Sequence, residues 1–222
     1  MCVKNRRLAL LFRAALVAGC GVGLGLNLGL FQGECKLSML VFFTILSNLV
    51  CFFFFLALLV RTARDLRRAG ARGATSFGPR LTGSVVLMIT VTMLVYHLLL
   101  APQLFTMDGG RPFSAGNFFV HTFTPLMTVL DWLLFSEKSA YRWFDPFVWL
   151  LIPYAYFGFA LVRAECGGVI AATGSRYPYF FIDVDALGWG GVLGYVALIT
   201  AAFVAIGYLF VLLDRVALKK RF

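Results

Sequence analysis

The stretch LSMLVFFTILSNLVCFFFFLALLV, residues Leu37–Val60, decides the fold class. It contains no charged residue and is longer than the roughly 20 apolar residues that an α-helix needs to cross a bilayer. Beyond Ser38 at its start, three polar side chains interrupt it: Thr44, Ser47 and Asn48. Polar groups in hydrocarbon are costly and usually functional. The stretch therefore predicts a membrane helix whose polar positions are candidates for a site.

Five further apolar runs predict a bundle. Apolar residues make up 61% of the chain and charged residues 14%, whereas soluble domains average about 45–50% and about 25%. We therefore predict an all-α integral membrane protein, a single domain (residues 1–222) with a bundle of six transmembrane helices. The fifth run is short, so tilt or bilayer thinning would have to accommodate it. The additional spans are Leu8–Leu30, Leu81–Ala101, Asn117–Phe135, Phe147–Val162 and Leu187–Leu213.

The basic residues predict the orientation of the bundle. The formal charge of +10 does not indicate nucleic acid as a partner, because Lys and Arg gather at the ends of apolar runs, where they act as topology signals. Their bias predicts a multi-pass protein of the cell membrane with both termini in the cytoplasm. The predicted cytoplasmic residues are Lys4, Arg6, Arg7, Arg61, Arg64, Arg67, Arg68, Arg72, Arg80, Lys138, Arg142, Arg215, Lys219, Lys220 and Arg221. The residues predicted on the outer side are Lys36, Arg111, Arg163 and Arg176.

The start of the chain has a second interpretation. The segment Val17-Ala18-Gly19-Cys20 resembles the end of a lipoprotein signal. Arg13 interrupts the apolar region and the run continues past Cys20, so we expect an uncleaved first helix. Among the cysteines, only Cys35 and Cys166 are predicted near the outer face, where a disulfide would require their loops to meet. No CxxC or Cys/His cluster indicates a metal site, and we expect no cofactor.

Three polar residues are predicted at similar depth in different helices. Thr44 lies about seven residues inside the second span, or roughly 10 Å at 1.5 Å per residue. His121 lies about four residues inside the fourth span, or roughly 6 Å, and His97 lies about four residues from the same face in the third. All three therefore fall in the outer half of a hydrocarbon core about 30 Å thick.

A hydroxyl beside an imidazole predicts nucleophilic catalysis. His121 as base would take the proton of Thr44, whose oxygen would attack an ester carbonyl to give an acyl-enzyme. Asn48 or Ser47, on the same helix face as Thr44, would donate a hydrogen bond to the developing oxyanion. Asp183, in the aromatic segment before the last helix, would orient the imidazole as the carboxylate does in a serine triad. We expect Asp185 to cap that last helix.

Each of these residues also has a structural interpretation. A membrane Thr commonly bonds a carbonyl of its own helix, and a lone His commonly fills a structural or interfacial place. Tyr96 is a donor in the site or an interfacial anchor. Asp131 is expected to pair with an Arg, and Pro125, one turn after His121, is expected to kink its helix and open a cavity.

Three segments resemble a known family: Phe42–Asn48, His121–Phe135 and Tyr177–Val184. They are similar to the androgen-induced and androgen-dependent membrane hydrolases, and resemble most its prokaryotic six-helix branch. The resemblance implies an intramembrane threonine hydrolase. Animal members cleave fatty acid esters of hydroxy fatty acids with a Thr early in one helix and an essential His in a later one. It therefore implies Thr44 as nucleophile, His121 as its partner and a membrane lipid or lipid ester as substrate.

Two other classes of protein also fit the sequence. His97 and His121 at similar depth on different helices are compatible with axial ligation of one haem, which would colour the purified protein. A small transporter or a structural membrane protein is the third class. Transporters favour inverted repeats and helices broken near the midplane, and the sequence has no visible repeat.

Overall fold

The computed structural model describes residues 2–106, 112–138 and 141–219. Every regular element within them is helical, and six helical segments are long and apolar enough to cross a membrane, which confirms the predicted all-α fold with six spans. The α-helices are α1 (Arg6–Leu28), α2 (Phe43–Ala69), α3 (Pro79–Val95), α4 (Ala101–Thr106), α5 (Ala115–Phe118), α6 (Thr124–Phe135), α7 (Asp145–Trp149), α8 (Leu151–Cys166) and α9 (Val184–Lys219).

Short helical turns join or precede several of these helices. The π-helical turn η3 (Tyr96–Leu100) makes α3 and α4 one span, and the π-helical turn η4 (Phe119–Phe123) makes α5 and α6 another. The third pair, α7 and α8, also forms one span. The 3₁₀ turns are η1 (Leu30–Gln32), η2 (Leu37–Val41) and η5 (Phe180–Ile182).

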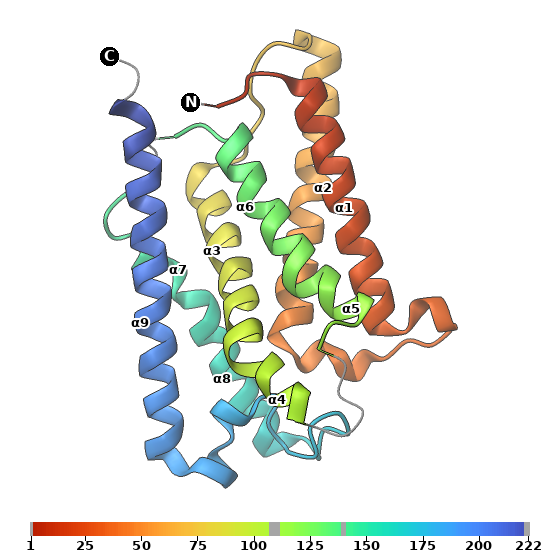
Figure 1. The fold of residues 1–222 in the computed structure, drawn as a ribbon, viewed down its shortest axis with the longest axis vertical. Helices are drawn as coiled ribbons and strands as arrows, with labels where there is room; N and C mark the ends of the chain where they lie inside the picture. The colour runs from red at the N-terminus through yellow and green to blue at the C-terminus, as the bar shows by residue number, and fades with distance from the viewer. Residues whose placement is uncertain (1, 107–111, 139–140, 220–222) are drawn as a thin grey trace.

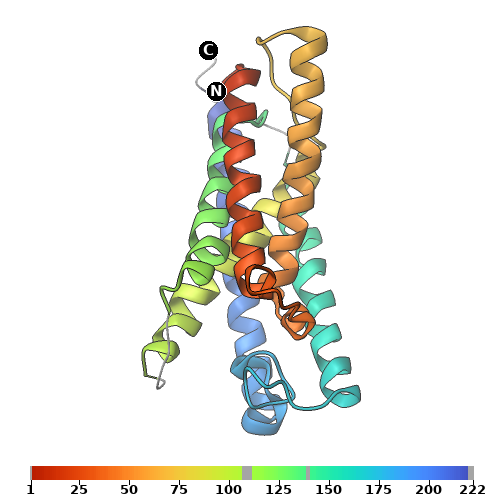
Figure 2. The same cartoon turned by 90° about the vertical axis from the view of Figure 1, so that its right-hand side faces the viewer.

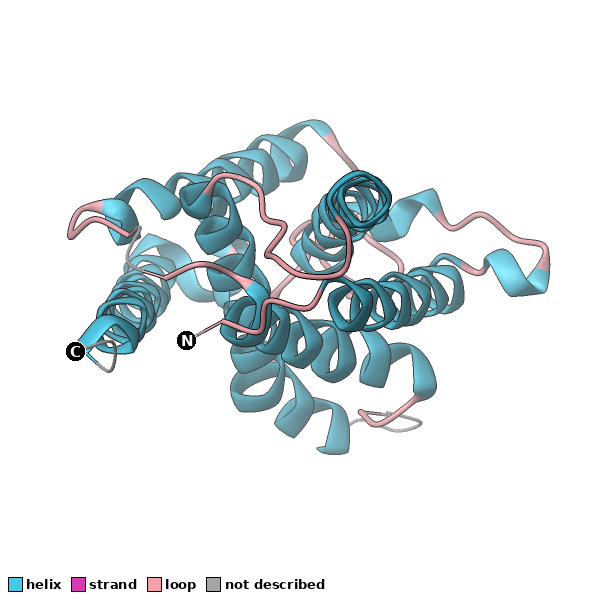
Figure 3. Ribbon diagram, turned by 90° about the horizontal axis from the view of Figure 1, so that it is seen from above, coloured by secondary structure: helices cyan, strands magenta, loops and turns pink. Residues whose placement is uncertain are grey.

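Both termini lie at one end of the bundle, together with the α2–α3 connection (Figure 1). We call this the terminal end. The opposite end carries the α1–α2 and α8–α9 connections (Figure 1). Helices α1 and α2 run side by side, and α9 lies at the far edge (Figures 1 and 2). Seen from the terminal end, the elements are helices joined by loops (Figure 3).

The second and fifth spans differ from their predicted bounds. The second was predicted to begin at Leu37, but residues 37–41 form η2 and α2 begins at Phe43. Thr44 therefore lies in the first turn of α2, not about seven residues inside it, because apolar composition does not separate a 3₁₀ turn from an α-helix. The fifth span runs over Asp145–Cys166, longer than predicted, so it has less need of tilt or bilayer thinning.

Two glycines let α1 approach the helix that carries His121. A Cβ on Gly19 would lie 2.1 Å from the ring of Phe123, and one on Gly23 would lie 2.7 Å from Cβ of Phe119. Neither distance is compatible with a side chain at those positions. Close backbone approach at small residues is the usual way in which membrane helices pack. Here it presses α1 against η4.

A buried ion pair joins three helices nearer the terminal end. Arg13 on α1 donates from Nε and Nη2 to the two carboxylate oxygens of Asp131 on α6, at 2.8 and 3.2 Å. Its Nη1 donates to Oγ1 of Thr62 on α2 at 2.7 Å and to the carbonyl of Thr75 at 3.1 Å. Both charged side chains are almost completely buried. Asp131 thus has the Arg partner expected for it, and the pair ties α1, α2 and α6 together.

Two further predictions concern residues at or beyond the ends of the long helices. Cys35 and Cys166 are free and exposed, so the two loops do not bring them into a disulfide. Arg111, Lys220 and Arg221, which contribute to the predicted charge bias, lie outside the described residues.

Candidate active site

Thr44 and His121 lie in contact in the structure. Thr44 stands in the first turn of α2 and His121 in the π-helical turn η4, and Oγ1 of Thr44 is 3.2 Å from Nε2 of His121. Their side chains are 9% and 6% exposed. A hydroxyl and an imidazole thus meet at hydrogen-bonding distance in a site from which bulk solvent is largely excluded.

The partner of the second imidazole nitrogen fixes the direction of this hydrogen bond. Nδ1 of His121 lies 3.2 Å from the carbonyl oxygen of Asn117. A carbonyl only accepts, so Nδ1 carries the proton, and in the neutral ring Nε2 is then an acceptor. The hydroxyl of Thr44 therefore donates to Nε2. This is the arrangement that general-base activation of a nucleophile requires.

The π-helical turn around His121 follows from the local sequence. Pro125 has no N–H and cannot bond back to the carbonyl of His121, and the N–H of Thr124 donates to Phe119 instead of Val120. The carbonyl of Val120 is thereby released from the helix ladder. It accepts a hydrogen bond from Nδ2 of Asn48 at 3.1 Å.

Asn48 and Ser47 do not have the role predicted for them. Nδ2 of Asn48 also donates to the carbonyl of Thr44 at 2.8 Å, so both amide hydrogens are engaged. Oγ of Ser47 lies 3.0 Å from the same carbonyl and 3.1 Å from Oγ1 of Thr92. Neither group points to an oxyanion beside Thr44. Asn48 instead links the backbone of the Thr44 residue to the turn that carries His121.

Asp183 was predicted to orient the imidazole, and this is wrong. Its carboxylate accepts from the backbone N–H of Ala186 at 3.0 Å and from Oγ of Ser175 at 2.5 Å, so it caps α9. Asp185, which we expected to be the cap, pairs with Arg176 at 2.8 Å. Asp183 thus has the capping role that was expected of Asp185, because α9 begins one residue before Asp185 and the residue before the first helical position is the one that caps.

Tyr96 and His97 lie beside the pair. The ring of Tyr96 stacks on that of His121, with centroids 3.6 Å apart and planes at 11°, while its hydroxyl donates to the carbonyl of Pro112. Tyr96 therefore packs against the face of the imidazole and is not a hydrogen-bond donor in the site. Nε2 of His97 bonds Oγ1 of Thr122 at 3.1 Å. Nε2 of each imidazole is thus bonded to a threonine hydroxyl, and axial ligation of one haem by the two rings stays a prediction that the colour of the purified protein tests.

Tyr179 is the site residue that the sequence did not single out. Its hydroxyl accepts from the backbone N–H of Thr44 at 3.3 Å and lies 3.5 Å from Oγ1 of Thr44. Burial raises the pKa of this hydroxyl, so it stays protonated and available as a donor. The signal in the sequence was the aromatic segment before the last helix, Tyr177–Val184. Which of its rings would reach α2 depends on the fold of the α8–α9 connection.

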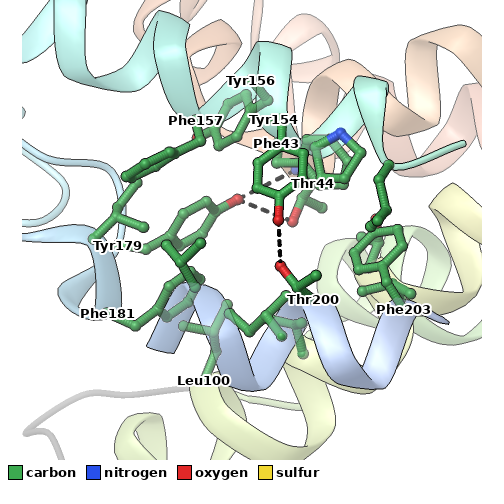
Figure 4. Close-up of a pocket in the computed structure, with 18 residues that line it drawn as sticks. Phe43, Thr44, Leu100, Tyr154, Tyr156, Phe157, Tyr179, Phe181, Thr200 and Phe203 are labelled. Carbon is green, nitrogen blue, oxygen red and sulfur yellow. Dashed lines mark hydrogen bonds between the residues drawn. The ribbon is translucent and has the colours of Figure 1, made fainter. Parts of the chain in front are cut away.

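Two cavities meet at Thr44. One has a volume of about 100 Å³ and is almost entirely apolar, with walls from α2, α3, α8, α9 and the Tyr179 segment (Figure 4). The other has about 310 Å³ and reaches His121; its lining is mostly apolar but includes the polar side chains of Asn27, Gln103, Ser175 and Asp183, and we call it the polar cavity. Thr44, Tyr179 and Leu100 line both. The hydroxyl of Thr44 thus stands where an almost entirely apolar cavity joins a larger one that also has polar side chains in its lining.

Comparisons with protein-family models, curated proteins and solved structures found no match for this chain. Within the described residues, no group of three or more His, Cys, Asp or Glu side chains gathers as a metal site.

Proposed function

We propose that this protein is an intramembrane hydrolase of lipid esters that uses Thr44 as nucleophile and His121 as base. The observation that carries the proposal is the chain of contacts from Oγ1 of Thr44 through His121 to the carbonyl of Asn117. Here a backbone carbonyl has the place that a carboxylate has in the serine triad. The resemblance of three segments to the membrane threonine hydrolases points to the same chemistry.

The reaction follows from these positions. Nε2 of His121 takes the proton of Thr44 as Oγ1 bonds to the ester carbonyl carbon. The tetrahedral intermediate collapses, the bond from carbon to the alcohol oxygen breaks, and His121 returns the proton to the leaving alcohol. Water from the polar cavity, deprotonated by His121, then cleaves the acyl-threonine and releases the carboxylic acid.

Tyr179 is the oxyanion donor in this proposal. The N–H of Thr44 donates to its hydroxyl, which leaves the hydroxyl hydrogen to point at Oγ1 or at an oxyanion forming beside it. Thr44 also lies in the first turn of α2, where the helix dipole favours negative charge. Donors fixed before the reaction stabilise the transition state without reorganisation.

The proposed setting is the cell membrane, with both termini in the cytoplasm. The six apolar segments support a multi-pass protein, and the concentration of Arg and Lys at the terminal end supports this orientation. The site then lies towards the outer leaflet, where amphipathic esters can reach it.

The test is hydrolysis of lipid esters by the purified protein in vesicles. We expect turnover by the wild type, and a rate lower by roughly 10³-fold or more in Thr44→Val, which keeps the shape but removes the hydroxyl. Thr44→Ser is expected to retain part of the activity, because the nucleophilic oxygen remains. Equal activity of Thr44→Val and wild type would disprove the proposal.

A further inference from the structure

The apolar cavity has one weakly closed side. Its floor is α3, where Val91 and Thr92 are buried, and its two side walls are α8 and α9. Tyr154 is the most exposed of its lining residues, at 43%. The cavity therefore opens between α8 and α9, on a face of the bundle that lies within two apolar spans.

A hydrogen bond between side chains crosses this opening. Oη of Tyr154 on α8 and Oγ1 of Thr200 on α9 are 2.9 Å apart (Figure 4). The neighbouring side chains are apolar and exposed: Leu151 is 66% exposed and Leu198 is 61% exposed. Exposed apolar side chains on a membrane span indicate a surface that faces hydrocarbon. The two hydroxyls there satisfy each other, and rotation of either side chain would break this bond.

We propose that the apolar cavity binds the acyl chain of the ester, which enters sideways from the bilayer through the opening that Tyr154 and Thr200 span. This rests on the hydrolase function proposed above and adds to it the assignment of the two compartments. The acyl chain lies between α8 and α9, with its carbonyl at Thr44. The alcohol leaves through the polar cavity, whose exposed lining residues Ala172 and Thr173 belong to the α8–α9 connection.

The volume of the cavity leads to a consequence for chain length. A cavity of about 150 Å³ holds one benzene molecule, so about 100 Å³ holds only a short stretch of hydrocarbon. The remainder of a long chain must pass through the opening and stay among the lipid tails. Long and short chains therefore need the opening to different degrees: a long chain requires it, and an acetyl group does not.

The experiment compares two esters in phosphatidylcholine vesicles: p-nitrophenyl palmitate and p-nitrophenyl acetate. Thr200→Trp fills the opening, and the matched control Leu198→Trp places the same ring on the lipid-facing side of α9. We expect Thr200→Trp to lower the ratio of palmitate to acetate hydrolysis by at least about tenfold, and Leu198→Trp to leave it unchanged. Tyr154→Phe removes only the hydrogen bond and is expected not to lower the ratio.

The outcomes separate this inference from the proposed function. A wild type that hydrolyses neither ester would disprove the hydrolase proposal itself. Hydrolysis of both esters with an unchanged ratio in Thr200→Trp would overturn the acyl opening alone. If Thr200→Trp does not purify folded, Val196→Phe, one helical turn away on the same cavity wall, is judged by the same ratio.

Discussion

Two buried polar pairs join helices of this bundle, and they are built differently. Arg13 and Asp131 form two hydrogen bonds with each other, and Thr62 and the carbonyl of Thr75 bond the guanidinium as well. Neither member lines either of the two cavities that meet at Thr44. Thr44 and His121 share one bond of 3.2 Å; Thr44 lines both cavities, and His121 lines the larger one.

The difference separates a structural pair from a reactive one. A charged pair in a low-dielectric interior is stable only when its hydrogen bonds are satisfied, which Arg13 and Asp131 achieve within the protein. The hydroxyl of Thr44 has a proton acceptor on one side and open volume on the other, which a nucleophile needs. Substitutions in the first pair should change stability, and substitutions around the second should change the rate.

The largest effect on stability is expected from Arg13→Met. The substitution leaves Asp131 as an unpaired buried charge and should destabilise the fold by about 3–5 kcal/mol. Thermal unfolding in detergent measures this, and the double variant Arg13→Met with Asp131→Leu should recover most of the loss. The kcat of the folded fraction should stay near that of the wild type. A loss of kcat in the folded double variant would contradict the assignment of Arg13 and Asp131 to stability alone.

Tyr179→Phe should lower kcat by about 10²–10³-fold, the usual effect of removing one oxyanion donor, with little change in KM or in unfolding temperature. Tyr195→Phe is the matched control. Tyr195 lies on α9, packs against the ring of Phe180 and lines neither cavity. Initial rates on a lipid ester check this. Equal losses in both variants would show that the aromatic segment acts only through packing.

Asn48→Leu tests the link between the nucleophile and the base. It removes both donors with little change of size, which frees the turn that carries His121 to move. A shift of about 1 Å costs on the order of a hundredfold in rate, so we expect kcat to fall by roughly ten- to a hundredfold while KM changes little. Ser47→Ala, which removes a hydroxyl that bonds Thr44 but not the His121 turn, should have a smaller effect. The reverse order would contradict a positioning role for Asn48.

The smallest effect is expected at Asp183. Asn also caps helices, so Asp183→Asn should change kcat by less than about twofold, and Asp183→Ala should cost about 1 kcal/mol of stability. A carboxylate that orients a catalytic imidazole would instead lower kcat by about 10⁴-fold when replaced by its amide. The kcat values of the two variants therefore decide whether the carbonyl of Asn117 is sufficient to orient the imidazole of His121.

The helices of the bundle were predictable and the details of the site were not. Long apolar runs define the spans because hydrocarbon excludes unpaired backbone groups. The sequence also selected Thr44 and His121, from polarity and depth, although Thr44 lies closer to the start of its helix than predicted. Asn48 and Asp183 were assigned the wrong tasks, because a donor's partner depends on the π-helical turn at η4 and on the residue at which α9 begins. Tyr179 reaches Thr44 across 135 residues of chain, a contact that no local pattern predicts.

Labelling by a fluorophosphonate probe, with the modified residue identified by mass spectrometry, tests the central claim most directly. Activation of Thr44 by His121 predicts one adduct, on Thr44, that is absent in Thr44→Val and in His121→Gln when both variants are folded. An adduct on Ser47 would contradict the assignment of the nucleophile. A folded wild type that does not react, or a His121→Gln variant that reacts as fast as the wild type, would contradict activation of Thr44 by His121.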